Sequence, residues 1–380
     1  MSSPQSASAG KRQRIILFGS YAPSLINFRG PLIAALIARG HEVFALAPDI
    51  DEGIAAQLKA LGAEPVDVPL RRASLDPRAA RRSSRELERR FAELRPDVVI
   101  AYTITPVVLA ASAARAVGAR FIPLITGLGY AFLGGFHPKR LLIRLAAILM
   151  YRRAFAKADM AFFQNEDDRR DFRRMRALPG GLRTAIVNGS GVDLARFPAQ
   201  PVPDAIVFLM IARFLKDKGV REYGAAAARL KREFPHARFQ LAGWLDQSPD
   251  AIGREELDAM IAAGVEDLGK LDDVRPALGG CSVYVLPSYR EGTPRSVLEA
   301  MAVGRAIVTT DAPGCRETVQ PEVNGMLVPP RDAEPLAAAM RRFIEQPELA
   351  RNMGAESRRI VEEKYDVHKV NAAIIAEGGL

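Results

Sequence analysis

The chain has 380 residues, of which 48% are hydrophobic and 26% charged, and it carries a formal net charge of +9. This length predicts two or three domains with full hydrophobic cores, and the composition excludes a disordered or collagen-like protein. Because the chain has only two cysteines and four widely separated histidines, a disulfide-stabilised scaffold and a compact metal motif are not expected.

The positive charge is concentrated in the first half of the chain. Residues 1–200 contain 30 Lys and Arg against 17 Asp and Glu, a net charge of +13, whereas the remaining 180 residues contain 23 against 27, a net −4. A basic half beside a mildly acidic one indicates that one domain faces an anionic partner. DNA, RNA, a membrane leaflet and a phosphorylated substrate would all fit this charge.

Short β-branched segments alternate with longer helical patterns along the first half. Strands are expected at 15–18, 42–47, 65–68, 98–101 and 120–125, and helices at 28–39, 53–61, 79–94 and 107–117. Such alternation predicts a parallel sheet with helices on both faces.

The pattern breaks at the turn-rich and proline-rich segment 188–203 and then restarts. Strands follow at 206–211, 238–241, 282–286 and 306–309, with helices at 220–233 and 294–303. We therefore predict an α/β protein with two Rossmann-like, doubly wound domains facing an interdomain cleft, where ligands bind at the carboxyl ends of strands. The expected division is a disordered tail at 1–13, a first domain at 14–198, a second at 199–365, and a C-terminal helix or tail at 366–380.

No segment resembles an export signal or a membrane span. The longest nearly uncharged stretch, at 145–151, is much shorter than the ~20 apolar residues that a spanning helix needs. We therefore expect a cytoplasmic protein that is soluble or peripherally bound to the inner face of the plasma membrane.

One loop of the second domain combines a carboxylate with a helix start. The expected strand at 282–286 leads through Glu291 and Gly292 to Thr293, an expected N-cap, and Pro294 then opens a helix. Backbone N–H groups at such a helix start favour a phosphate. Glu299 lies just over a turn into the helix, where it could accept from a ribose diol. The same spacing also fits an ordinary loop with two solvated glutamates.

A basic turn follows the first strand of the second domain. Arg213, Lys216 and Lys218 lie together before Gly219. Cations at the carboxyl end of a parallel strand suit a diphosphate, which Arg213 could grip as a fork and Lys218 as a point charge. A solvated basic loop is the alternative.

The first domain lacks a dinucleotide fingerprint. The segments that follow two of its strands, Gly19–Ser24 and Thr126–Gly129, do not match G-x-G-x-x-G, which disfavours an NAD-dependent enzyme. Asp49-Ile50-Asp51 has the form of a metal-binding D-x-D motif, but we expect it to cap the following helix.

Two segments carry most of the surplus positive charge. Residues 71–90 contain eight arginines, and an expected helix at 139–157 contains six Lys and Arg, no acidic residue and the apolar stretch 145–151. This pattern fits a helix in an anionic lipid interface and also a core helix with solvated ends. Nucleic acid is not expected, because no stacking platform or known binding motif accompanies the arginines. The residues expected at a membrane are Arg71, Arg72, Lys139, Arg140 and Arg144.

Taken together, the motifs resemble those of the retaining glycosyltransferases of family 4. The segment from Glu291 to Glu299 resembles the E-x7-E signature, Arg213 and Lys218 the diphosphate-binding pair, and 188–193 the N-G-x-G-V-D motif. The segments 27–29, 102–106 and 125–129 resemble the bacterial subgroup that extends undecaprenyl-diphosphate-linked sugars. The resemblance covers about residues 14–370.

The resemblance implies a GT-B fold, a nucleotide-sugar donor, retention at the anomeric carbon and no metal requirement. It implies that Arg213 and Lys218 hold the donor diphosphate and that Glu291 faces the transferred sugar, and these three are the expected catalytic residues. The further donor-binding residues are Gly292, Thr293, Glu299, Trp244 and Gly19. Trp244 either lines the pocket for the nucleotide base of the donor or serves only to pack the protein. The residues expected on the acceptor or sugar side are Asn27, Arg29, Thr103, Thr105, Thr126 and Gly127. Many family members have a histidine where this chain has Thr103 and Thr105, so no imidazole contacts the sugar from that loop.

The sequence therefore predicts a hexosyltransferase that moves a sugar, expected to be an N-acetylhexosamine, from a UDP-sugar to a polyprenyl-diphosphate-linked saccharide. This reaction would serve surface-glycan or glycoprotein-glycan assembly. The expected partners are the donor, the lipid-linked acceptor and an anionic membrane surface, with no cofactor and no nucleic acid. The alternatives are a UDP-sugar 2-epimerase on the same architecture and a non-catalytic membrane-associated binding protein.

Overall fold

The computed structural model describes residues 11–68, 77–129, 132, 138–246, 248 and 250–380. The chain forms two compact α/β units. The first unit comprises Met1–Thr126, Pro138–Val187 and Asn371–Leu380, and the second comprises Gly127–His137 and Asn188–Val370. The chain thus changes unit after Val187 rather than at the expected 198/199, and its last residues return to the first unit.

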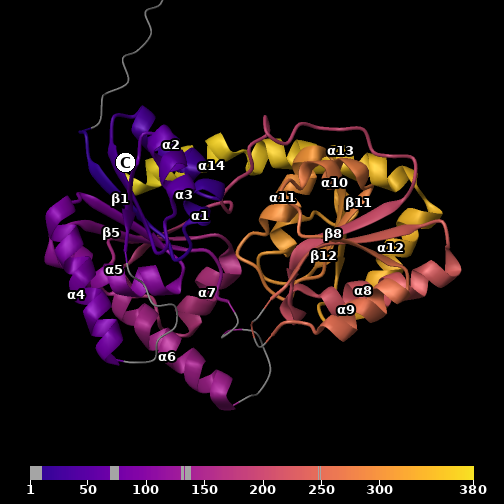
Figure 1. Cartoon of the computed structure of the whole chain (residues 1–380), viewed down its shortest axis with the longest axis horizontal. Coiled ribbons are helices and arrows are strands. Elements are labelled where there is room, and N and C mark those ends of the chain that lie inside the picture. Colours follow the sequence, from indigo (N-terminus) through magenta and orange to yellow (C-terminus); the bar gives the residue numbers. More distant parts are fainter. Residues whose placement is uncertain (1–10, 69–76, 130–131, 133–137, 247, 249) are drawn as a thin grey trace, which may run out of the picture. The chain divides into compact units, whose positions relative to one another are not determined.

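A seven-stranded parallel sheet with the order β3-β2-β1-β4-β5-β6-β7 forms the centre of the first unit. Helices α4, α5 and α6 lie on one side of this sheet, and α2, α3 and α14 lie on the other (Figure 1). The strands are β1 (Arg14–Phe18), β2 (Glu42–Ala47), β3 (Glu64–Asp67), β4 (Val98–Tyr102), β5 (Arg120–Ile125), β6 (Met160–Phe163) and β7 (Arg183–Ile186). The helices are α1 (Pro23–Asn27), α2 (Gly30–Ala38), α3 (Glu52–Ala60), α4 (Pro77–Leu94), α5 (Ile104–Ala116), α6 (Pro138–Phe155), α7 (Glu166–Arg174) and α14 (Val367–Gly378).

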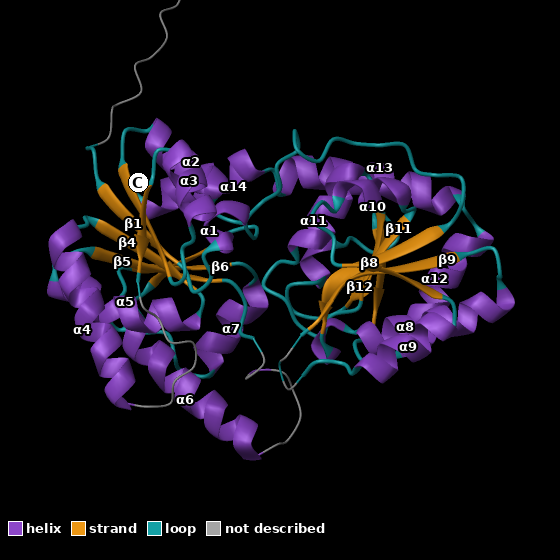
Figure 2. Cartoon of the chain, viewed as in Figure 1, coloured by secondary structure: helices purple, strands orange, loops and turns teal. Residues whose placement is uncertain are grey.

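The second unit is built in the same way on a six-stranded parallel sheet with the order β10-β9-β8-β11-β12-β13. Helices again cover both of its faces, as Figure 2 shows. The strands are β8 (Val207–Phe214), β9 (Arg238–Leu245), β10 (Val265–Gly269), β11 (Val283–Leu286), β12 (Ala306–Thr310) and β13 (Gly325–Val328). The helices are α8 (Val220–Glu233), α9 (Arg254–Ala262), α10 (Arg275–Gly280), α11 (Arg295–Val303), α12 (Ala333–Glu345) and α13 (Glu348–Lys364), with short 3₁₀ turns η2 (Lys216–Lys218) and η3 (Arg316–Thr318).

The predicted alternation of strands and helices is confirmed in both units. The strands β2 and β5 and the helix α8 have the expected bounds. The expected cap also forms, because the Asp51 carboxylate accepts a hydrogen bond of 2.7 Å from the Ile54 N–H at the start of α3. The central strands form because they consist of fully buried apolar residues, as parallel strands covered on both faces require.

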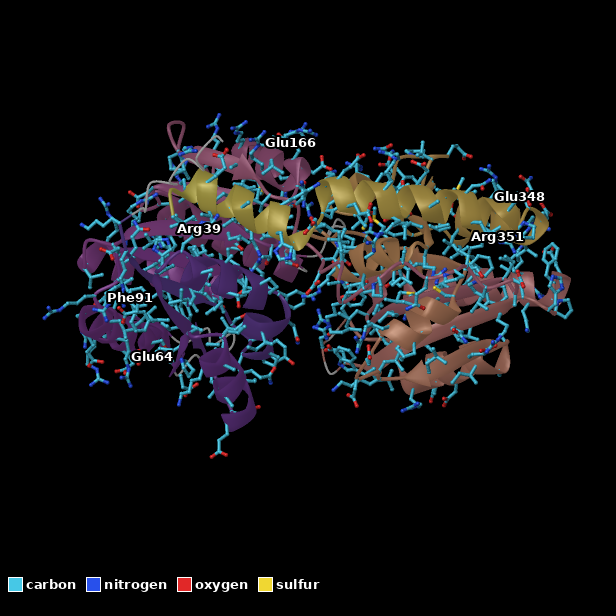
Figure 3. All side chains as sticks on the ribbon, turned by 90° about the horizontal axis from the view of Figure 1, so that it is seen from above. Arg39, Glu64, Phe91, Glu166, Glu348 and Arg351 are labelled. Carbon is cyan, nitrogen blue, oxygen red and sulfur yellow. The ribbon has the colours of Figure 1, made fainter. Side chains whose placement is uncertain are left out.

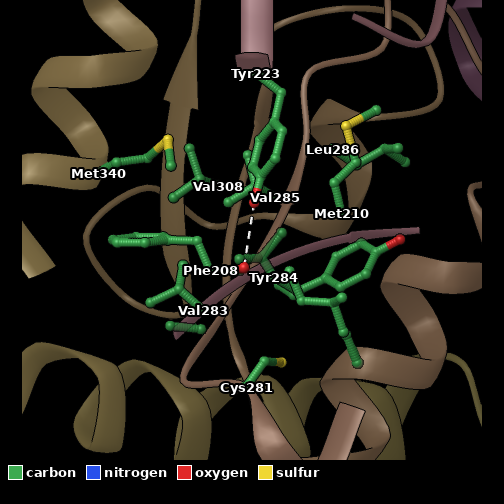
Figure 4. Close-up of a cluster of buried hydrophobic side chains, with 14 of the residues drawn as sticks. Phe208, Met210, Tyr223, Cys281, Val283, Tyr284, Val285, Leu286, Val308 and Met340 are labelled. Atoms are coloured by element: carbon green, nitrogen blue, oxygen red, sulfur yellow. Dashed lines mark hydrogen bonds between the residues drawn. The ribbon is translucent and has the colours of Figure 1, made fainter. Parts of the chain in front are cut away.

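The core of the second unit is packed around β8 and β11, and Figure 4 shows part of it. Phe208 stacks on Phe239 with ring centroids 5.3 Å apart. The buried Tyr223 hydroxyl of α8 donates to the carbonyls of Phe208 at 3.2 Å and Gln240 at 2.9 Å, which ties the helix to the sheet. The outer face of α13 is polar by contrast: Glu348 and Arg351 are exposed there (Figure 3). The sheet that carries the loops at its carboxyl edge is thus tied to α8 by hydrogen bonds and surrounded by a buried core.

Candidate functional site

The carboxyl edge of the second sheet holds a largely buried ion pair. Lys218, at the end of η2, places its Nζ 2.5 Å from Oε1 of Glu291 in the loop after β11, and the two side chains are 18% and 16% exposed. The Ser288 hydroxyl donates to the same carboxylate oxygen at 2.8 Å. The backbone N–H of Tyr289 donates to the Asp217 carbonyl at 2.8 Å, so both chain segments are fixed together.

The charges of this cluster favour a protonated lysine. Burial lowers the pKa of Lys218, but the negative charges of Glu291 and Asp217 outweigh burial, and the pKa is raised overall. Burial raises the pKa of the Asp217 carboxyl, and the Lys218 ammonium opposes that shift. A cation is thus held at the edge of the sheet where doubly wound folds bind ligands.

Two glycines allow the backbone to approach the ion pair closely. Gly219 has φ +74°, and a Cβ there would lie 2.2 Å from the Pro287 carbonyl oxygen. Gly314 has φ +80°, and a Cβ there would lie 2.2 Å from the Glu291 carbonyl oxygen. Both positions need glycine for its conformation and for its lack of a side chain. The loop that carries Glu291 is therefore positioned by backbone packing from two sides.

Glu299 lies on α11 and is held by an arginine of the same helix. Arg295 Nε donates to Glu299 Oε1 at 2.8 Å, and the side chains are 20% and 13% exposed. Burial raises the pKa of the Glu299 carboxyl, and Arg295 opposes this shift. Arg295 is not among the residues predicted from the sequence, although its i, i+4 spacing from Glu299 is a signal for such a pair.

The start of α11 differs from the prediction by one residue. Thr293 was expected as the N-cap, but Pro294 holds that position with φ −72° and ψ 109°, and the cap makes no side-chain hydrogen bond. The reason is that Pro294 is extended, and its carbonyl already accepts from the N–H groups of Val297 at 3.1 Å and Leu298 at 3.3 Å. The expected N-cap position is therefore wrong by one residue, since Thr293 lies directly before the cap.

Arg213 and Trp244 lie side by side as register partners on β8 and β9. Arg213 is 49% exposed, and its Nη1 lies 3.1 Å from Oδ2 of Asp246, a residue not predicted from the sequence. The Trp244 side chain is 46% exposed, and Lys270 Nζ lies 5.8 Å from its ring centroid. The indole ring is accordingly not part of the core of the second unit.

Two further predicted segments pack on the loop before α11. A Cβ on Gly127 would lie 3.1 Å from the Gly292 nitrogen, and a Cβ on Gly189 would lie 2.8 Å from the Thr293 Cβ. The structure therefore brings Gly127, Gly292 and Thr293 together within the second unit. Thr126 belongs to the first unit.

Gly19, expected at the donor, and Arg29, expected on the sugar side, both lie against Tyr102 in the first unit. A Cβ on Gly19 would lie 2.3 Å from the Tyr102 hydroxyl oxygen, and the guanidinium carbon of the buried Arg29 lies 4.9 Å from the Tyr102 ring centroid. Thr103 donates a hydrogen bond of 2.9 Å to the Ser20 hydroxyl and has φ +66°, which a β-branched residue rarely adopts. Of the other predicted residues of the first unit, Asn27 is exposed and Thr105 is half-buried.

Part of the expected membrane surface lies outside the described residues. Arg71 and Arg72 fall there, as do residues 1–10 of the expected tail and the side chains of Lys139 and Arg140. Arg144 is exposed on α6. Among the helices of the described ranges, none combines the length and the apolar character that crossing a membrane requires.

Known proteins similar to this chain were found by sequence and by structure. Residues 29–189 match the "glycosyl transferase 4-like domain" family, and residues 193–360 match the "glycosyl transferases group 1" family. The chain is 31% identical over 358 residues to the N,N'-diacetylbacillosaminyl-diphospho-undecaprenol alpha-1,3-N-acetylgalactosaminyltransferase of Campylobacter jejuni, which covers 90% of this chain and 92% of that protein.

Two solved structures have the same fold at low sequence identity. Sucrose-phosphate synthase from Thermosynechococcus elongatus matches with a TM-score of 0.80 and 19% identity over 96% of this chain and 97% of that one. The Anabaena protein HepE, solved in complex with UDP, matches with a TM-score of 0.77 and 17% identity over 96% and 99%. These likenesses confirm the predicted GT-B fold class with two Rossmann-like units.

Proposed function

Because the chain belongs to the family 4 glycosyltransferases, we propose that it is a retaining hexosyltransferase that moves an N-acetylhexosamine from a UDP-sugar to a polyprenyl-diphosphate-linked saccharide. The buried Lys218–Glu291 pair at the carboxyl edge of the second sheet carries this proposal. The name of the Campylobacter relative describes an undecaprenyl-diphosphate-linked acceptor, which supports the same acceptor class here. This reaction would serve surface-glycan or glycoprotein-glycan assembly at the cytoplasmic face of the membrane.

In this proposal different residues bind different parts of the nucleotide-sugar donor. Lys218 and Arg213 bind the diphosphate, the first as a buried point charge and the second as a half-exposed fork. Glu299 accepts from the ribose hydroxyls, and the Arg295 guanidinium beside it opposes the rise in the Glu299 pKa that burial causes. Glu291 faces the sugar. Lys218, which is paired with Glu291 in this structure, contacts both Glu291 and the diphosphate when the donor binds.

The proposed reaction breaks the bond between the anomeric carbon and the donor phosphate oxygen. The acceptor hydroxyl attacks that carbon from the same face, and its proton passes to the departing phosphate oxygen, so charge and atoms balance. The negative charge on the leaving diphosphate is stabilised by Lys218 and Arg213, which are in place before the reaction. Since these cations supply the positive charge, we propose that no metal ion is required.

The direct test is an assay of the purified chain with a panel of UDP-sugars and a short-chain polyprenyl-diphosphate sugar, with and without EDTA. Mass spectrometry identifies the product, and NMR of the new linkage reports whether the anomeric configuration is retained. Conversion of the UDP-sugar without an acceptor would instead indicate the epimerase. Folded protein that neither converts nor binds any donor would contradict the proposal.

Gly314→Ala tests the positioning of Glu291. A methyl group at this position would lie 2.2 Å from the Glu291 carbonyl oxygen and clash with it. We expect the displaced loop to lower kcat/KM for the donor by about tenfold or more. Gly304→Ala is the matched control, because Gly304 has a similar φ of +85° but its Cβ would lie 3.7 Å from the nearest atom. Equal losses in the two variants would mean that backbone strain alone, and not the clash, causes the effect.

Arg295→Met tests whether Glu299 binds donor as a carboxylate. Arg295 lowers the pKa of Glu299 against the effect of burial, so the variant should raise that pKa further. Protonated Glu299 is a poorer acceptor, so the rise of donor KM at acidic pH should move to higher pH while kcat at high pH stays nearly unchanged. The measurement is a pH profile of donor KM, and Arg295→Lys should restore most of the wild-type profile. An unchanged profile would show that Arg295 has only a structural role.

A further inference from the structure

The helix α6 exposes an unusual amount of apolar surface. Six of the twelve large hydrophobic side chains that are exposed in the described chain lie on it. Their exposed fractions range from 38% for Met150 to 69% for Leu142. The six residues are Leu141, Leu142, Ile143, Leu145, Leu149 and Met150. A cluster of this kind on one helix marks an interaction surface, whereas scattered single residues would not.

The two halves of α6 differ in their environment. The C-terminal half is anchored in the first unit: Tyr151 packs edge-on against Phe172 at 4.9 Å between centroids, and Phe155 contacts Phe172 at 5.3 Å. Leu142, Leu145 and Leu149 are spaced i, i+3 and i+7 and therefore share a face of the helix, and all three are about half exposed or more. The exposed apolar face is thus presented by a helix that the core holds firmly.

The charge of α6 indicates what covers this face. Its 18 residues include five Lys and Arg and no Asp or Glu, and Arg152 and Arg153 are exposed beside the leucines. A second copy of the chain would bring five more positive charges against these five, which disfavours self-association. Leucines flanked by arginines without any acid match an anionic phospholipid surface, where apolar side chains enter the interface and the cations contact headgroups.

We propose that the face of α6 formed by Leu142, Leu145 and Leu149 inserts into an anionic membrane interface, with Arg152 and Arg153 at the headgroups. The helix lies on the membrane and does not span it. The purpose of this contact, to bring the site to a lipid-linked acceptor, rests on the proposed function. The binding itself does not, because it needs neither donor nor acceptor.

The experiment is co-sedimentation of the full chain with two kinds of vesicle. One is phosphatidylcholine alone, and the other contains about 30% phosphatidylglycerol, which gives it a negative surface. We expect binding to the anionic vesicles, weakened at least tenfold in Leu142→Glu/Leu145→Glu and weakened by added salt in the wild type. Ile261→Glu is the control, since Ile261 is 40% exposed on α9 of the second unit. The expected result is wild-type binding for this control.

Three outcomes would overturn the inference. They are absence of wild-type binding to the anionic vesicles, equal binding by the Leu142→Glu/Leu145→Glu variant, and a change of molar mass in that variant, which would assign the face to a second copy. Transfer to a water-soluble short-chain acceptor, measured in the same samples, separates this question from the proposed function. The variant should keep that activity even where vesicle binding is lost.

Discussion

Lys218→Met is expected to lower kcat/KM for the donor by about 10²–10³-fold or more, the range seen when one preorganised electrostatic contact to a developing charge is removed. Lys218 is 18% exposed and bonded to Glu291, so its ammonium cannot be replaced by water without a large loss of positive potential at the diphosphate. Methionine keeps the apolar stem and removes the charge. Steady-state transfer rates and calorimetric donor binding should both show the loss.

Control variants separate catalysis from stability. Lys218→Met alone leaves Glu291 buried without its cation, which also destabilises the second unit. Lys218→Met/Glu291→Gln removes both charges, so stability should recover while transfer stays lost. Lys216→Met changes a cation of the same 3₁₀ turn that has no ion pair within the described ranges, and we expect an effect below threefold. Recovery of transfer in the double variant would show that Lys218 serves only to neutralise Glu291.

The central part of each sheet could be predicted from the sequence because its strands carry their own signal. Val98–Tyr102 and Val283–Leu286 are continuous apolar runs, and fully buried parallel strands require such runs. Four strands were not predicted: the short apolar strands β6 and β13, and the edge strands β7 and β10 with the sequences RTAI and VEDLG. The strands β7 and β10 are half exposed and polar, so pairing with a neighbouring strand, rather than their own pattern, determines them.

The candidate site was predicted in its residue types but not in its pairings. Glu291 and Lys218 were selected separately, each from its place after a strand, and the fold joins them over 73 residues of sequence. Asp246 was missed because it contacts Arg213, 33 residues away in sequence, only through tertiary structure. Ser288 was also missed, although it lies only three residues before Glu291 in the same loop. The positive φ of Thr103 could not be predicted from the sequence, because threonine rarely adopts this backbone conformation and nothing in its residue type indicates it.

The sequence of α6 left two interpretations, a core helix and a lipid-facing helix, and the structure contains features of both. Composition alone cannot separate them, because leucines and arginines suit either environment. The difference lies in what each residue packs against: Tyr151 and Phe155 are buried against Phe172, whereas Leu142 is 69% exposed. The packing of neighbouring helices therefore determines which half of α6 is buried and which half is exposed.

Arg305→Met is expected to destabilise the second unit by about 3 kcal/mol or more, because it leaves several buried carbonyl groups unpaired. The Arg305 side chain is fully buried, and burial lowers the pKa of its guanidinium group. Its Nε donates to the Leu278 carbonyl at 2.9 Å, and its Nη2 donates to the carbonyls of Pro201 at 3.0 Å and Gly279 at 3.1 Å. One side chain thus joins the proline-rich segment, the end of α10 and the start of β12.

Trp244 is the single tryptophan of the chain and lies on β9, so urea unfolding followed by its fluorescence reports on the second unit. Arg351→Met is the control: Arg351 pairs with Asp204 at 2.7 Å, but the two side chains are 58% and 97% exposed, and a change within about 0.5 kcal/mol is expected. If Arg305→Met unfolds at the same urea concentration as this control, the three carbonyls must be satisfied in another way, and the segment around Pro201 is then held to the second unit mainly by its apolar contacts.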